Sequence, residues 1–120
     1  MYALTRQEVE ASPSVVIGTI CISGHSALAL FDSGSTHSFV SHAFARGLCI
    51  APTLLDDELC VGSPSGSLLC ANEVLRSCKI GIGERILVAN LILLPMHDFD
   101  VILGMDWLST YHASVKCYEK

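Results

Sequence analysis

Short apolar runs, separated by glycine, serine and proline, define the pattern of this chain. β-branched residues dominate positions 15–22 (VVIGTICI), Gly24 and His25 interrupt the run, and apolar residues resume over 27–31. Two strand-like runs on either side of a turn signal predict a β-hairpin. An ionisable residue, Asp32, follows the second run directly.

The same pattern continues through the middle of the chain. Strand-like apolar pieces fill most of 53–94, and the residues that separate them are Gly, Ser and Pro at 62–67, Gly-Ile-Gly-Glu at 81–84, and Pro95. The first cluster has the composition of a hairpin tip, and the second has that of a tight turn. The pattern therefore predicts a mostly β chain.

One segment changes to a helical period. Apolar residues recur at helical spacing over 39–44, which predicts a short helix at about 38–46. Thr36 or Ser38 is expected to cap its start, and Gly47 to end it.

The last block, FDVILGMDWLSTYHASVKC, predicts four consecutive features. They are a buried strand at 101–103, a glycine, a short helix and a closing strand. The predicted class is mostly β with one or two short helices.

Composition narrows the architecture. At 120 residues and 51% hydrophobic content, the chain is long enough for one domain with a real core. Only 16% of the residues are charged, which excludes a disordered chain. The apolar excess is more than a small monomer hides easily, so we expect part of the surface to be buried against another chain or a ligand. Residues 1–13 are polar and predict a tail or linker, which leaves 14–120 as the domain.

Charge and hydropathy argue against two kinds of partner. The net charge is −5 and no basic cluster is present, so we expect no nucleic-acid binding by this domain. No apolar run approaches the roughly 18 residues that cross a membrane, and the N-terminal residues do not have the composition of a signal peptide. We therefore expect a cytoplasmic protein with no membrane partner.

The six cysteines lie at positions 21, 49, 60, 70, 78 and 117. They form no C-x-x-C pair and no Cys/His quartet of the zinc type, so we predict neither a metal site nor a cofactor. Without a secretory signal we expect reduced, mostly buried thiols. A disulfide framework is the less favoured alternative.

Asp32 raises a chemical question because it follows an apolar run. An isolated buried carboxylate is costly unless it is paired, hydrogen-bonded or neutralised. Asp32-Ser33-Gly34 is also ordinary turn chemistry, so the tripeptide alone does not identify a site. A second signal comes late in the chain, where Ile-Leu-Gly occupies 102–104.

Taken together, these stretches resemble the aspartic proteases, and among them the retropepsins, the half-size homodimeric branch. The matching stretches are ALALFDSGSTHSFVS, CVGSPSG and KIGIGERILVANLILLPMHDFDVILGMDWLSTYHA, in this order, and they span roughly residues 14–117. Within the branch the sequence is most similar to proteases of plant Ty3/Gypsy-type retrotransposon polyproteins. The resemblance implies a retropepsin-like closed β-barrel half-domain that hydrolyses peptide bonds during polyprotein processing.

The resemblance implies that Asp32 is the catalytic residue. Two carboxylates that share one proton activate water and protonate the scissile carbonyl, as is established for aspartic proteases. This chain has a single Asp-Ser-Gly, because Asp98, Asp100 and Asp106 are not followed by Ser-Gly or Thr-Gly. The second carboxylate is therefore expected from a second copy of the chain, in a C2 homodimer with both Asp32 residues on the axis.

The residues after Asp32 are expected to support it. By resemblance, Ser33 reaches the partner's loop, and Gly34 lets the backbone approach the carboxylate closely. Ser35 replaces the alanine common in retropepsins, and its hydroxyl is expected to donate to the outer oxygen of Asp32. Such a bond favours the ionised form. It predicts a more acidic activity optimum than that of a Ser35→Ala variant.

The resemblance also implies a flap, a hairpin that closes over an extended peptide substrate. Its residues would be Val61, Gly62, Ser63, Pro64, Ser65 and Gly66. Leu30 and Ile102 are expected to shape apolar substrate pockets. Leu103 and Gly104 are expected to pack beneath the Asp32 loop.

Two functions stay open at this point. One is an active aspartic endopeptidase of a retrotransposon polyprotein, located in the cytoplasm or in a virus-like particle. The other is an inactive or domesticated retropepsin-like domain used for dimerisation or peptide binding. The second is favoured by the small flap tip SPSG, and by a sequence that stops at CYEK where relatives continue in an apolar strand of the dimer sheet.

Overall fold

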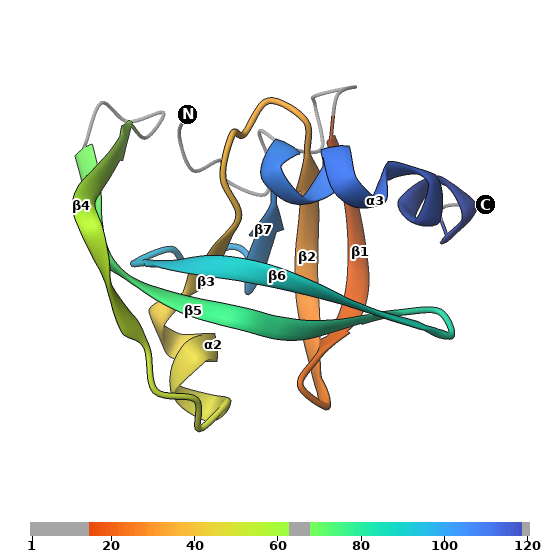
Figure 1. Cartoon of the computed structure of the whole chain (residues 1–120), viewed down its shortest axis with the longest axis horizontal. Coiled ribbons are helices and arrows are strands. Elements are labelled where there is room, and N and C mark those ends of the chain that lie inside the picture. The colour runs from red at the N-terminus through yellow and green to blue at the C-terminus, as the bar shows by residue number, and fades with distance from the viewer. Residues whose placement is uncertain (1–14, 63–67, 119–120) are drawn as a thin grey trace.

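A computed structural model describes residues 15–62 and 68–118; residues 1–14, 63–67 and 119–120 lie outside the described part. Strands dominate the chain, with two helices among the described residues (Figure 1). In chain order the elements are β1 (Val15–Ile22), β2 (His25–Asp32), β3 (Phe39–Ser41), α2 (His42–Gly47), β4 (Thr53–Gly62), β5 (Leu68–Ile82), β6 (Arg85–Leu94), β7 (Val101–Leu103) and α3 (Met105–Tyr118).

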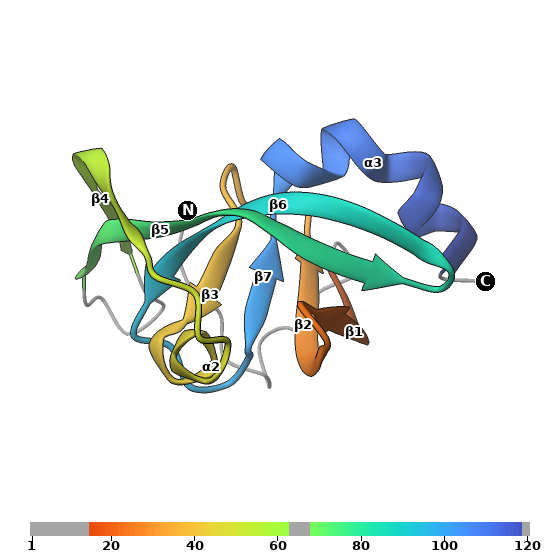
Figure 2. The same cartoon turned by 60° about the horizontal axis from the view of Figure 1, so that its bottom comes forward.

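The seven strands form one sheet that closes on itself. Their order is β1-β2-β7-β3-β6-β5-β4, and an additional pairing of β1 with β5 joins the two ends of the six-strand part. β4 remains outside the closure, as an edge strand on β5. In Figure 2, β5 and β6 cross over the strands β1, β2 and β7, as expected when a strongly twisted sheet curls into a barrel. The predicted closed, mostly β fold is confirmed.

Two hairpins follow the sequence prediction. β1 and β2 pair antiparallel down to Ile22 and His25, and the two turn residues between them have positive φ, 48° at Ser23 and 87° at Gly24. Such angles match the right-handed twist of the flanking strands. β5 and β6 are joined by a similar two-residue turn that begins at Gly83, with φ 61°.

The core is divided between the two faces of the central strands. Alternate residues of β2 point to opposite sides, so Ala29 and Phe31 join a larger cluster that includes Trp107. Leu30 joins a second cluster that includes Ile102. The end of β2 and all of β7 are buried, so the Asp32 loop begins from a rigid part of the sheet.

The helix predicted at about 38–46 is present only from His42 onward, and its predicted first part is a strand. Residues 39–41 form β3, which is inserted between β6 and β7, and the helix begins only at His42. Its cap is Ser41, whose hydroxyl accepts a hydrogen bond from the Phe44 amide at 3.0 Å, rather than Thr36 or Ser38. Pairing with two buried strands outweighed the local helical period.

The predicted closing strand was also wrong. α3 continues from Met105 to Tyr118, with a kink at Tyr111 where φ is −120° and ψ is 19°. A helix satisfies its main-chain groups internally, whereas a strand needs a partner edge. Within the described ranges no helix is long and apolar enough to cross a membrane.

Candidate active site

Asp32 is the last residue of β2, and its side chain is 6% exposed. The Gly34 amide donates to Asp32 Oδ1 at 2.8 Å, and the Ser35 amide donates to the Asp32 carbonyl at 3.2 Å. A Cβ at Gly34 would lie 3.2 Å from the same carboxylate oxygen. The turn therefore closes tightly on the carboxylate, and glycine is the residue that permits it.

The Ser35 hydroxyl does not donate a hydrogen bond to Asp32. It donates to the carbonyl of His37 at 2.6 Å, and a hydroxyl has only one proton to give. The expected bond from Ser35 to the outer oxygen of Asp32 is therefore wrong in this chain. Ser35 is fully buried and stabilises the turn instead.

Residues 33–38, between β2 and β3, form the Asp32 loop, and the junction of β7 and α3 anchors this loop. Ser38 Oγ accepts from the Gly104 amide at 3.0 Å and donates to Asp106 Oδ1 at 2.7 Å. The Met105 amide donates to the Ser35 carbonyl at 2.6 Å. These bonds join segments about 70 residues apart in the sequence.

Sequence reasoning missed Ser38 and Asp106 as a pair. Ser38 entered only as a possible helix cap, and Asp106 only as an acid that lacks a following Ser-Gly. No local pattern links them, because the contact exists only once β7 lies beside β2 and β3.

Gly104 lies directly under the loop. A Cβ there would be 2.2 Å from the His37 carbonyl oxygen and 2.7 Å from that of Ser35. Real Cβ atoms do not approach so closely, so no side chain fits at this position. The preceding Leu103 is fully buried and is the register partner of Phe31.

The two predicted pocket residues are brought together but are not open to solvent. Leu30 and Ile102 are register partners across β2 and β7, with exposures of 0% and 1%. Val61, the first predicted flap residue, belongs to the same cluster. Neither pocket residue offers surface to a substrate in this conformation, so their role in specificity stays a prediction.

The predicted flap is only partly described. Val61 and Gly62 end β4 and face Leu69 and Leu68 of β5, as the two arms of a hairpin. Ser63, Pro64, Ser65 and Gly66 lie outside the described residues. The hairpin arms are where the sequence placed them, and the flap itself stays a prediction.

The cysteines differ from the expected set of reduced, buried thiols. Cys60 and Cys70 form a disulfide between β4 and β5, and Cys21 and Cys49 are exposed. Only Cys78, among the free cysteines described, is buried, and burial raises the pKa of its thiol. The expectation was wrong because exposure and pairing depend on strand register, which spacing does not encode.

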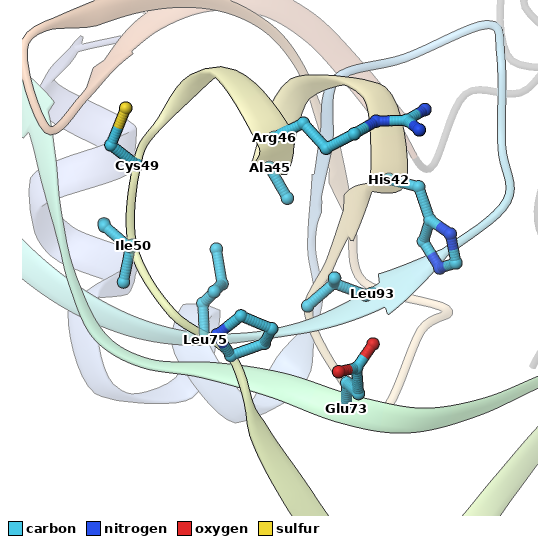
Figure 3. Close-up of a pocket in the computed structure, with 9 residues that line it drawn as sticks. His42, Ala45, Arg46, Cys49, Ile50, Glu73, Leu75 and Leu93 are labelled. Atoms are coloured by element: carbon cyan, nitrogen blue, oxygen red, sulfur yellow. The ribbon is translucent and has the colours of Figure 1, made fainter.

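A hollow of about 310 Å³ lies elsewhere, between α2 and the strands β5 and β6 (Figure 3). Its walls combine apolar and charged side chains: His42, Ala45, Arg46, Cys49, Ile50, Pro52, Glu73, Leu75 and Leu93. α2 follows β3, which runs antiparallel to β7 and so leads away from the Asp32 end of the barrel. None of the predicted site residues lines this hollow.

The geometry so far describes one buried carboxylate in a rigid glycine-containing turn. The sequence profile of the retroviral aspartyl proteases matches residues 1–120, the whole chain. The chain belongs to this family. No curated protein matches it.

Two solved structures share the fold. The EIAV protease, in complex with an inhibitor, is similar with a TM-score of 0.60 and 16% identity, over 83% of this chain and 90% of that one. The retroviral protease-like domain of Ddi1 from Leishmania major is similar with a TM-score of 0.60 and 11% identity, over 84% of this chain and 80% of that one. At these identities the similarity shows the fold, which confirms the retropepsin-like prediction for this retroviral aspartyl protease domain.

Proposed function

We propose that this retropepsin-like domain is an aspartic endopeptidase that acts as a C2 homodimer, with Asp32 of each chain as the catalytic residue. The observation that carries the proposal is the carboxylate of Asp32, 6% exposed at the end of β2 and held by the Gly34 amide. A buried carboxylate at the end of β2, in a turn that is hydrogen-bonded to the junction of β7 and α3, is a preorganised functional group.

The proposed reaction uses the chain's own residues. In the dimer, two carboxylates held about 3 Å apart share one proton. One takes a proton from water as it attacks the scissile carbonyl, and the other gives a proton to the carbonyl oxygen. The Gly34 amide keeps Oδ1 of Asp32 oriented throughout, and Ser33, exposed in the single chain, reaches the partner's loop.

The need for a second chain comes from the sequence and is supported by the surface. Asp-Ser-Gly occurs once, so one chain holds half of a two-carboxylate site. Met105 is 40% exposed although its amide is bonded to the Asp32 loop through Ser35. An apolar side chain beside the proposed axis gains by burial against a second copy.

The proposed substrate is an extended peptide with apolar residues around the cleaved bond. Main-chain hydrogen bonds beneath the hairpin of β4 and β5 would hold it as an added strand. By its resemblance to plant Ty3/Gypsy-type proteases, we place the chain in the processing of a retrotransposon polyprotein, in the cytoplasm or in a virus-like particle. No cofactor or metal takes part in this proposal.

The test is cleavage of a fluorogenic peptide library between about pH 4 and 7, at concentrations that favour dimers. Asp32→Asn is expected to lower cleavage by at least ~100-fold, because general acid–base catalysis contributes that much or more. Asp98→Asn, an exposed acid outside the loop, is the matched control and should cleave like the wild type. Equal cleavage by wild type and Asp32→Asn would refute the proposal.

A second candidate is an inactive retropepsin-like domain that dimerises or binds peptides. This candidate stays open because the fold is shared, at a TM-score of 0.60, with the retroviral protease-like domain of Ddi1. It predicts peptide binding without turnover, and binding that Asp32→Asn leaves intact. Equilibrium binding of uncleaved library peptides distinguishes it from the endopeptidase.

A further inference from the structure

Cys60 and Cys70 occupy directly opposed positions on β4 and β5. They are register partners in the antiparallel pair, with Cα atoms 4.0 Å apart, and their sulfur atoms are bonded. The bridge closes a segment with a sequence separation of 10. It therefore ties together the two arms of one hairpin near the end where β4 stops at Gly62.

The bridge is open to reagents in solution. Cys60 and Cys70 are exposed, while their neighbours Val61 and Ala71 are buried. The pleat turns one face of the hairpin end toward the second core cluster and the other toward water. Exposed disulfides are the ones that exchange readily with soluble thiols.

The strand pairing around the bridge is short and irregular. β4 is an edge strand, and its register with β5 shifts between Leu54 and Leu59. Residues 55–58 face only Asn72 on β5, because the next pair is Leu59 with Ala71. The hairpin end consists of four residue pairs, 59–62 with 68–71, and the irregular stretch separates them from the rest of the ladder.

We propose that Cys60 and Cys70 form a reversible thiol–disulfide switch that sets the order of this hairpin end. In the oxidising direction the two thiols lose two protons and two electrons and form the S–S bond. Oxidised glutathione accepts the electrons and protons and leaves as two molecules of reduced glutathione. In the reducing direction the same steps run backwards. Cys78 does not compete, because it is buried and lies on β5 away from the bridge.

The bridge acts on the packing beneath the hairpin. Val61 and Ala71, each 4% exposed, belong to the cluster that contains Leu30 and Ile102. With the bridge formed, the loss of chain entropy on seating Val61 is reduced, because the arms are already joined. With the bridge open, the hairpin end keeps its four residue pairs and the packing of Val61 and Ala71, but it loses the covalent link between its arms.

Charge near the bridge gives the switch a preference among reductants. A carboxylate oxygen of Glu58 lies 3.9 Å from the Cys60 sulfur. The attacking group is a thiolate in both cases. Glutathione brings further negative charge to the site, so the carboxylate repels it more strongly than it repels dithiothreitol. Glu58→Gln is expected to speed reduction by glutathione about twofold to fivefold and to speed reduction by dithiothreitol by a smaller factor.

The first measurement counts thiols in the folded full-length chain. When cysteines that carry glutathione are identified by mass and counted with the alkylated ones, exposure to oxidised glutathione should give two fewer such cysteines than exposure to dithiothreitol. Fragmentation of the labelled peptides should place both differences at positions 60 and 70. Labelling of all six cysteines under both conditions would overturn the proposal, and so would a bridge that excess reduced glutathione fails to open.

The second measurement follows backbone amide exchange at 59–62 and 68–71. Reduction, or either of Cys60→Ser and Cys70→Ser, should speed exchange there by about 10-fold to 100-fold, with residues 15–32 unaffected. Cys21→Ser, an exposed free thiol on β1, is the matched control and should respond to reductant like the wild type. Unchanged exchange at the hairpin end on reduction would mean that the bridge does not affect the order of this segment, and it would overturn the proposal. Because neither measurement uses peptide cleavage, its result is independent of the proposed endopeptidase activity.

Discussion

At the scale of single residues, the Asp32 loop depends on the lack of a side chain at Gly104. Gly104 contacts two carbonyl groups of the loop at distances that exclude a Cβ. The Ser35 carbonyl accepts from the Met105 amide at the junction of β7 and α3, and the His37 carbonyl accepts from the Ser35 hydroxyl within the loop. The glycine therefore links the rigidity of the loop to the position of the candidate catalytic carboxylate.

Gly104→Ala is expected to lower the free energy of unfolding by about 3 kcal/mol, because the backbone must move to admit the methyl group. Urea denaturation followed by circular dichroism measures the change. Gly47→Ala is the control, since a Cβ at Gly47 meets no atom within 4 Å. A cost at Gly104 no larger than that at Gly47 would contradict the packing argument.

Ser35→Ala separates the two roles considered for this hydroxyl. Since the hydroxyl donates to the His37 carbonyl, its loss should cost about 1 kcal/mol of stability and leave the pH optimum of cleavage unchanged. Chemical denaturation and a pH–rate profile measure the two effects. Thr36→Ala, at an exposed neighbour, should change stability by less than about 0.5 kcal/mol. A shifted optimum in Ser35→Ala would show that the hydroxyl bonds to Asp32 in the active dimer.

Residues differ in how visible their roles are in the sequence. Asp32 and Gly34 were found because both lie in one tripeptide, and a glycine after a catalytic acid has a local reason. The role of Ser38 was not found, because its two partners lie 66 and 68 residues away. A hydrogen bond across that separation is a property of the fold and leaves no mark on neighbouring residues.

At the scale of elements, alternation and turn residues predicted the long strands well. β1, β2, β5 and β6 follow from apolar runs bounded by Gly-containing turns. The three-residue strand β3 and the C-terminal part of α3 did not follow. β3 is too short to show a period, and the strands that pair with it decide its state, whereas the equally short β7 was predicted from its apolar run.

Ser41→Ala tests the boundary between β3 and α2. The Ser41 hydroxyl caps the helix by accepting from the Phe44 amide, so its removal should cost about 1 kcal/mol. For a domain of this size that corresponds to a fall of about 4 °C in the thermal midpoint. Ser109→Ala, at an exposed position of α3, is the control and should leave the midpoint nearly unchanged. Equal midpoints for the two variants would argue against the cap.

At the scale of the whole molecule, the question is whether one chain suffices for catalysis. The barrel closes within one chain, yet the carboxylate that it presents is single. Folding and activity are therefore separable: the monomer can be a complete folding unit and half of an active site. The exposed apolar side chains of Met105 and Leu68 indicate surface that a second copy can bury.

Mixing experiments test the shared site directly. When equal amounts of wild type and Asp32→Asn exchange subunits at a fixed wild-type concentration, cleavage should fall to about half, because mixed dimers hold one carboxylate each. Mixing with an unrelated protein is the control for crowding. Cleavage that stays at the wild-type level would mean that one Asp32 is enough, and sedimentation at several concentrations would then show an active monomer.

The sequence by itself determined the class of the fold, the family resemblance and the candidate catalytic acid. It did so because strand alternation, turn chemistry and Asp-Ser-Gly are all local patterns. Only the tertiary structure decided that Ser35 bonds to His37, that Ser38 joins Asp106, and that Cys60 faces Cys70. Each of these depends on loop geometry or strand register, which many distant residues fix together when the barrel closes.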